Sequence, residues 1–170
     1  MMSALEGEGN RYFPAVVTDG RIDVLTGLDA PEIFYKFLER AIAQTSRNPD
    51  HITALLRFRL TFDESTQSVE FEVAALSDFL KKRTRADENL VRIGEVTFLI
   101  LTRVANEDEL ARMIERFSQA IPDFQARYSG KREFVDSDQA STKFASQVKI
   151  SAFLYKNGES MLDFLERAGV

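Results

Sequence analysis

A strand–turn–strand pattern between residues 85 and 101 constrains the fold of this 170-residue chain more than any other stretch. Residues 90–93 are mostly apolar, and residues 96–101 are rich in β-branched and aromatic side chains, as is typical of buried strands. Gly94-Glu95 between them predicts a tight turn, because glycine can adopt a positive φ. The chemistry that this hairpin supports should then depend on the side chains at its tip.

Two further stretches alternate between apolar and polar residues with the period of a strand. The first, 52–62, places Arg57 and Arg59 on one face and large apolar side chains on the other. The second covers 148–154. We expect Arg57 and Arg59 either to bind an anion or to pair with nearby acids such as Glu95, and we favour the pairing.

Four helices are predicted from capping residues and from apolar side chains at helical spacing. Asp29 is the expected cap of the first helix, which should end at Asn48, and the second should cover about 69–83. Asn106 should cap the third helix, which Pro122 is expected to follow. A fourth follows the turn at 157–158, and a hairpin is possible around Ser129-Gly130.

The order of these elements predicts an α/β (α+β) fold in which helices flank a mostly antiparallel central sheet. We expect residues 1–21 to form an N-terminal leader and residues 22–170 to form one domain.

Composition excludes several classes of function. The net charge is −5 and no long basic run occurs, so neither nucleic acid nor an anionic membrane surface is an expected partner. The chain has no cysteine and a single histidine, which excludes disulfides and thiolate chemistry and disfavours a zinc site. No apolar run is long enough to cross a bilayer, so membrane insertion is not expected and the cytoplasm is the expected location.

Three short motifs together resemble a known family. Residues 23–28, DVLTGL, resemble the D-x-L-T-G-L motif of GGDEF domains, the diguanylate cyclase family. Residues 92–98, RIGEVTF, resemble the R-x-G-G-D-E-F box, and residues 147–153 resemble a late strand of the form V-S-I-G-V-A. The resemblance covers residues 22–168. It implies the palm-like fold of nucleotide cyclases, with a central sheet of about five strands.

The resemblance also implies an activity that this chain is not equipped to perform. Active members join two GTP molecules into cyclic di-GMP across a dimer, using carboxylates that hold Mg²⁺. The box here reads Gly94, Glu95, Val96, Thr97 and Phe98, so its second glycine and both of its acids are replaced.

The strand that should carry the other metal-binding carboxylate has Arg57 and Arg59, or Arg59 and Thr61 in the alternative register. An arginine would repel Mg²⁺. The link to the next helix is too short for the guanine-recognition segment, and only Glu70 lies near its last acid. We therefore predict a degenerate GGDEF domain with no catalytic residue, metal or cofactor.

One family feature is partly retained, an inhibitory product-binding motif R-x-x-D, which appears here as Arg85 followed by Glu88. Arg85 could contact a guanine edge or a phosphate, and Glu88 could accept from a guanine N–H. A solvated charged loop is the simpler interpretation of the same residues.

Three functions remain open at this stage. They are a regulatory or protein-interaction module, a cyclic di-GMP receptor acting through Arg85 and Glu88, and a residual diguanylate cyclase. The first is favoured, with a homodimer or an attached or separate signalling domain such as EAL as the expected partner.

Overall fold

The computed structural model describes residues 20–62, 66, 68–129 and 144–170. Within these residues helices and strands alternate around one hairpin, in an order that matches the order predicted from the sequence. The elements are α1 (Pro31–Arg47), β1 (Ile52–Thr61), α2 (Val69–Arg83), β2 (Asn89–Gly94), β3 (Thr97–Val104), α3 (Glu107–Ser129), β4 (Gln147–Leu154) and α4 (Met161–Arg167).

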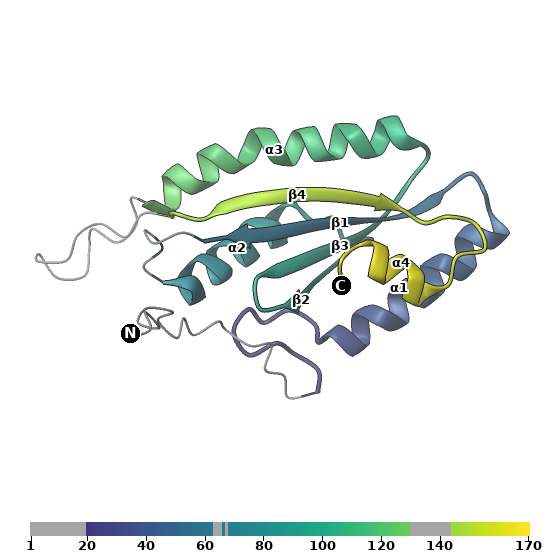
Figure 1. The fold of residues 1–170 in the computed structure, drawn as a ribbon, viewed down its shortest axis with the longest axis horizontal. Helices are drawn as coiled ribbons and strands as arrows, with labels where there is room; N and C mark the ends of the chain where they lie inside the picture. Colours follow the sequence, from purple (N-terminus) through teal and green to yellow (C-terminus); the bar gives the residue numbers. More distant parts are fainter. Residues whose placement is uncertain (1–19, 63–65, 67, 130–143) are drawn as a thin grey trace, which may run out of the picture.

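The strands form one sheet in the order β2-β3-β1-β4, and every neighbouring pair is antiparallel. The α+β prediction with a mostly antiparallel sheet is therefore confirmed. The expected number of about five strands is too high for the described part of the chain, where the sheet has four. Figure 1 shows β4 at one edge beside α3 and the β2–β3 hairpin at the other edge.

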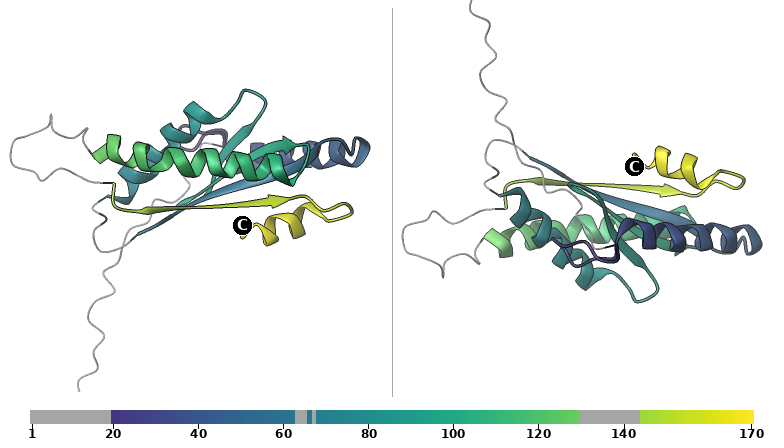
Figure 2. Two further views of the ribbon diagram at one scale, coloured as in Figure 1. Left: turned by 90° about the horizontal axis from the view of Figure 1, so that it is seen from above. Right: turned by 90° about the horizontal axis from the view of Figure 1, so that it is seen from below.

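Two apolar cores lie on opposite faces of this sheet. On one face, alternate residues of β1 and β3 pack against α2 and α3, and Phe58 meets Phe117 edge to face at 4.9 Å. On the other face Leu55 and Leu99 pack against α1 and α4. Figure 2 shows α3 and α4 on opposite sides of β4. The strict alternation of β1 produces this division, because successive side chains of a strand point to opposite faces.

The hairpin forms where it was predicted, but its turn lies one residue later. Gly94 is the last residue of β2 and pairs with Thr97, so the turn residues are Glu95 and Val96. Gly94 does not have a positive φ. The reason is a register shift between Arg92 and Gly94, a bulge that adds one residue to β2 before the chain turns.

Two helix ends also differ from the prediction. The N-cap of α1 is Ala30, which provides no side-chain cap, while Asp29 forms an isolated β-bridge with Ile22. Pro122 does not follow α3 but lies inside it. The neighbouring side chains of Ile121 and Phe124 are buried in the core, and this burial offsets the backbone hydrogen bond that proline removes.

Three predictions fall wholly or partly outside the described residues. The proposed leader reaches into the described part only at residues 20–21. Of the possible hairpin around Ser129-Gly130, Ser129 is the last residue of α3 and Gly130 is not described. The extent of the domain stays a prediction.

Candidate functional site

A buried ion pair fixes the base of the hairpin. The guanidinium of Arg92 binds the carboxylate of Asp23 at two points, with Nε 2.7 Å from Oδ2 and Nη2 2.8 Å from Oδ1. Both side chains are fully buried. Burial raises the pKa of Asp23, but the hydrogen bonds from Arg92 and Thr26 outweigh it and hold this pKa below its ordinary value. The segment 23–28 is thereby attached to β2.

The same guanidinium also holds the tip. Arg92 Nη1 donates to the carbonyl oxygen of Glu95 at 3.2 Å, and the Leu60 N–H donates to the Val96 carbonyl oxygen at 3.1 Å. The backbone of the turn is thus fixed from two sides. Because these two hydrogen bonds hold the backbone of the turn, the chemistry of the tip depends on its side chains.

Those side chains offer a single carboxylate. Glu95 is exposed, Val96 is half-buried and packs against the α2–α3 core, and Thr97 is half-buried at the start of β3. Phe98 is fully buried in the same core. Among the described residues, no group of three or more Asp, Glu, His or Cys side chains is placed to hold a metal ion.

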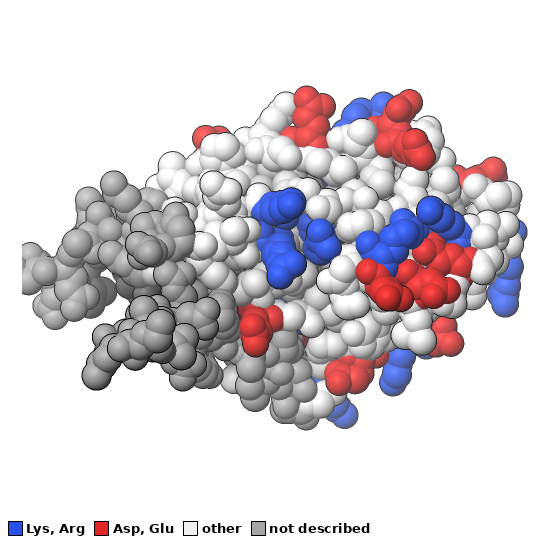
Figure 3. All heavy atoms as spheres, in the orientation of Figure 1, with Lys and Arg blue, Asp and Glu red and all other residues white. Residues whose placement is uncertain are grey.

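The strand that faces the tip presents positive charge. Arg59 lies directly opposite Thr97 across the β1–β3 pair, and directly opposite Lys149 across the β1–β4 pair. Both cations are exposed. Like charges at such opposed positions repel one another. Figure 3 shows a group of Lys and Arg side chains over the middle of the sheet, beside an acidic group over α4.

Arg57 has a different role from Arg59. Its Nη1 donates to the carbonyl oxygen of Ala168 at 2.6 Å, and its guanidinium lies 5.3 Å from the centre of the Phe153 ring. Arg57 therefore holds the end of α4 against the sheet. In the described part of the chain neither Arg57 nor Arg59 forms an ion pair, so the favoured pairing with Glu95 or other acids is wrong.

The predicted dinucleotide-binding pair occupies the loop between α2 and β2. Arg85 is exposed, whereas only 9% of Glu88 is exposed. Glu88 accepts from the Arg85 backbone N–H at 2.9 Å through Oε2, and from the Thr102 hydroxyl at 2.8 Å through Oε1. Glu88 thus shapes the loop that presents Arg85. Whether the pair binds a nucleotide stays a prediction.

Sequence reasoning assigned no role to two buried acids. One is Asp23, and the sequence signal that could have identified it is a single acid in the otherwise uncharged motif of residues 23–28. The other is Glu72 on α2, which is 1% exposed and accepts from the backbone N–H groups of Ala145 at 2.7 Å and Ser146 at 3.1 Å. It ties α2 to the chain just before β4.

No protein-family model matches the sequence, and no curated protein matches it either. Solved structures do match. One is the GGDEF domain of DgcB from Caulobacter crescentus in complex with cyclic di-GMP, with a TM-score of 0.66 at 18% identity over 91% of this chain and 86% of that one. The chain has the fold of a GGDEF domain.

Two other solved structures match the fold of this chain as well. The FimX GGDEF domain from Pseudomonas aeruginosa has a TM-score of 0.59 at 14% identity, covering 89% of this chain and 90% of that one. The diguanylate cyclase SiaD from the same organism, in complex with its activator SiaC, has a TM-score of 0.61 at 14% identity over 87% of this chain and 55% of that one. Identities this low establish the fold and no more.

None of the helices in the described residues combines the length and the apolar character that crossing a bilayer requires.

Proposed function

We propose that this chain is a degenerate GGDEF domain that makes no cyclic di-GMP and acts in cyclic di-GMP signalling as a regulatory or protein-interaction module. The observation that carries this proposal is the pairing of Arg59 with Thr97. The resemblance calls for metal-binding carboxylates on β1 and in the box, and this chain has a cation opposite a hydroxyl. Such a pair repels Mg²⁺ instead of binding it.

The contacts that hold the hairpin in place support a role that depends on the fold and needs no catalysis. The Asp23–Arg92 ion pair and the bonds to the turn backbone keep the hairpin in place even though the acids of the box are absent. The complex of SiaD with its activator SiaC is an example in which a protein with this fold has a protein partner.

A direct test is incubation of the full chain with GTP and Mg²⁺, followed by chromatographic separation of the nucleotides. We expect GTP to remain unchanged after prolonged incubation, alongside a GGDEF enzyme that converts the same GTP. Accumulation of cyclic di-GMP that disappears when GTP is replaced by its α,β-methylene analogue, in which the bond to the pyrophosphate leaving group cannot break, would overturn the proposal and favour a residual cyclase.

A second candidate function is cyclic di-GMP binding through the loop that carries Arg85 and Glu88. Its support is that Arg85 is exposed on a loop that Glu88 braces, and that DgcB is a GGDEF domain in complex with cyclic di-GMP. Calorimetric titration with cyclic di-GMP tests it, with Arg85→Gln as the matched variant. Heat that is lost in Arg85→Gln supports the receptor; the absence of heat at high micromolar concentration removes it.

A further inference from the structure

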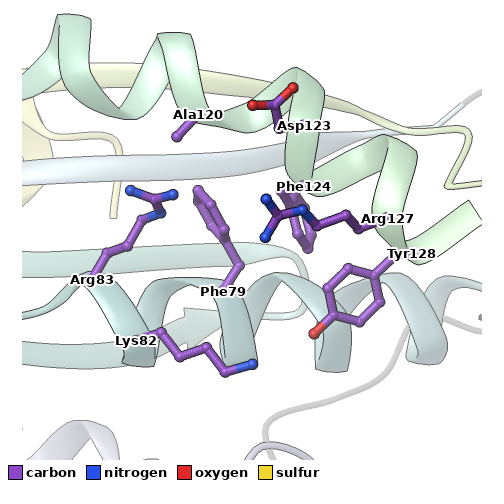
Figure 4. Close-up of a pocket in the computed structure, with 8 residues that line it drawn as sticks. All are labelled: Phe79, Lys82, Arg83, Ala120, Asp123, Phe124, Arg127 and Tyr128. Carbon is purple, nitrogen blue, oxygen red and sulfur yellow. The ribbon is translucent and has the colours of Figure 1, made fainter.

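A groove of about 420 Å³ lies between α2 and α3, and residues of these two helices line it (Figure 4). Its volume is within the range of small-molecule sites, about 300–1,000 Å³. The side chains that line it are mainly cations and aromatic rings, and those that concern binding are Phe79, Lys82, Arg83, Asp123, Arg127 and Tyr128.

The positive charges of this groove come from both helices. Arg83 belongs to the last turn of α2 and Arg127 to the last turns of α3, and Figure 4 shows their guanidinium groups on either side of the Phe79 ring. Lys82 adds a third cation, and Asp123 is the single acid among the lining residues. Within the described residues none of the three cations forms an ion pair. The groove therefore has uncompensated positive charge in a chain whose net charge is −5.

The floor of the groove consists of packed aromatic rings. Phe79 stacks on Phe124 with ring centres 4.5 Å apart, and Phe124 meets Tyr128 edge to face at 4.9 Å. The guanidinium of Arg83 is 4.8 Å from the centre of the Phe79 ring. This cation–π contact favours a position of the exposed Arg83 side chain over the floor, which lowers the entropy that binding costs.

We propose that this groove is a binding site for a small anion attached to a flat ring, of which a nucleoside monophosphate is the simplest example. Two guanidinium groups on either side of the Phe79 ring suit a phosphate, because each can donate two parallel hydrogen bonds to its oxygens. The flat faces of Arg83 and Tyr128 suit the ring, since aromatic rings and guanidinium groups both stack on a base. Asp123 at the rim can accept from a hydroxyl or amino group of the ligand.

This site differs from the one that the family resemblance suggests. The groove uses Arg83 and Arg127, whereas the site in the α2–β2 loop uses Arg85 and Glu88. The carboxylate oxygens of Glu88 already accept from the Arg85 backbone N–H and from the Thr102 hydroxyl. The two sites can therefore be separated by single substitutions. The groove proposal also does not depend on whether the chain makes cyclic di-GMP.

The experiment is a titration of the ¹⁵N-labelled full chain with adenosine 5′-monophosphate, followed by amide chemical shifts and by calorimetry. We expect shifts centred on residues 82–83 and 123–128 and saturation below about 1 mM. Adenosine and inorganic phosphate should each bind at least about tenfold more weakly, because each lacks half of the recognised chemistry. If inorganic phosphate binds as tightly as adenosine 5′-monophosphate, the groove does not recognise a ring, and the proposed class of ligand is wrong.

Matched variants locate the site. Arg83→Gln and Arg127→Gln should each weaken nucleotide binding about tenfold or more, because each removes charge-assisted hydrogen bonds from an exposed side chain without disturbing the core. Arg83→Lys should recover only part of the affinity, since it restores charge without a plane for stacking. Arg112→Gln, at an exposed position of α3 outside the groove lining, is the control and should leave the affinity unchanged. No shift at 1 mM, or a loss in Arg112→Gln as large as in Arg83→Gln, overturns the proposal.

Discussion

The carboxylate of Asp23 and the guanidinium of Arg92 form a fully buried, two-point ion pair between residues 69 positions apart in the sequence. Arg92 reaches from this pair to the carbonyl oxygen of Glu95, so one side chain connects the segment before α1, strand β2 and the turn. The position of the hairpin therefore depends on Arg92 and Asp23, which lie outside its tip, and not on the side chains of Glu95, Val96 and Thr97.

Removing one member of this pair should be costly. Arg92→Met leaves the Asp23 carboxylate buried without its partner, and we expect the free energy of unfolding to fall by about 3–5 kcal/mol. Urea titration followed by circular dichroism measures the change. Arg103→Met, at an exposed position of β3, is the control and should change it by less than about 0.5 kcal/mol. Equal effects of the two substitutions would show that the pair contributes nothing specific.

The pair should also make stability depend on pH. Because the folded-state pKa of Asp23 is held below its ordinary value of 3.8, its contribution is complete above that value and is lost as the pH falls towards the folded-state pKa. Asp23→Asn lacks this contribution at every pH. The difference in unfolding free energy between the wild type and Asp23→Asn should therefore shrink from about pH 6 to about pH 3. A difference that stays constant over this range contradicts the assigned pKa.

The sequence predicted elements well where one short-range signal dominated. The period-two alternation of 52–62 located β1 and assigned Arg57 and Arg59 to one face, and apolar spacing located α2. Errors occurred where a tertiary contact outweighed a local signal. Pro122 usually indicates a helix end, but the buried neighbours Ile121 and Phe124 carry α3 past it.

The site residues were harder to predict, because their roles depend on partners far away in the chain. Glu88 was identified as a ligand-binding candidate, and its contact with Thr102 follows only from the pairing of β2 with β3. The groove between α2 and α3 could not be predicted from the sequence for a similar reason. Phe79 and Phe124 each belong to the apolar stripe of a helix, and only the packing of α2 on α3 places Arg83 and Arg127 around them.

Glu72 should stabilise the connection between α2 and β4. Its two carboxylate oxygens accept from the N–H groups of Ala145 and Ser146. In Glu72→Gln the amide nitrogen must face one of these donors, so we expect a loss of about 1–3 kcal/mol in unfolding free energy. Glu70→Gln, at an exposed position in the same helix turn, is the matched control and should be nearly neutral. Similar losses in both variants would indicate a general charge effect on α2.

Glu88 should determine the order of the loop that presents Arg85. Glu88→Gln weakens the acceptor of the Arg85 N–H, and we expect amide hydrogen exchange at Arg85 to become about tenfold faster. Thr102→Val, which removes the hydroxyl that orients Glu88, should have a smaller effect in the same direction. Asp87→Asn changes an exposed neighbouring charge and should leave the exchange rate unchanged. Unaltered exchange in Glu88→Gln would contradict the bracing role.

The opposed cations Arg59 and Lys149 lead to the prediction of a stabilising substitution. Lys149→Glu replaces a repulsive cross-strand pair by an attractive one, so the free energy of unfolding should rise by about 0.5–1 kcal/mol at low salt. Lys149→Gln removes only the repulsion and should give a smaller gain, and both gains should decrease in high salt, which screens exposed charges. Urea titrations at two salt concentrations measure these differences. If Lys149→Glu is no more stable than Lys149→Gln, then Arg59 does not interact electrostatically with position 149 across the strands. The repulsion between Arg59 and Lys149 would then not lower the free energy of unfolding.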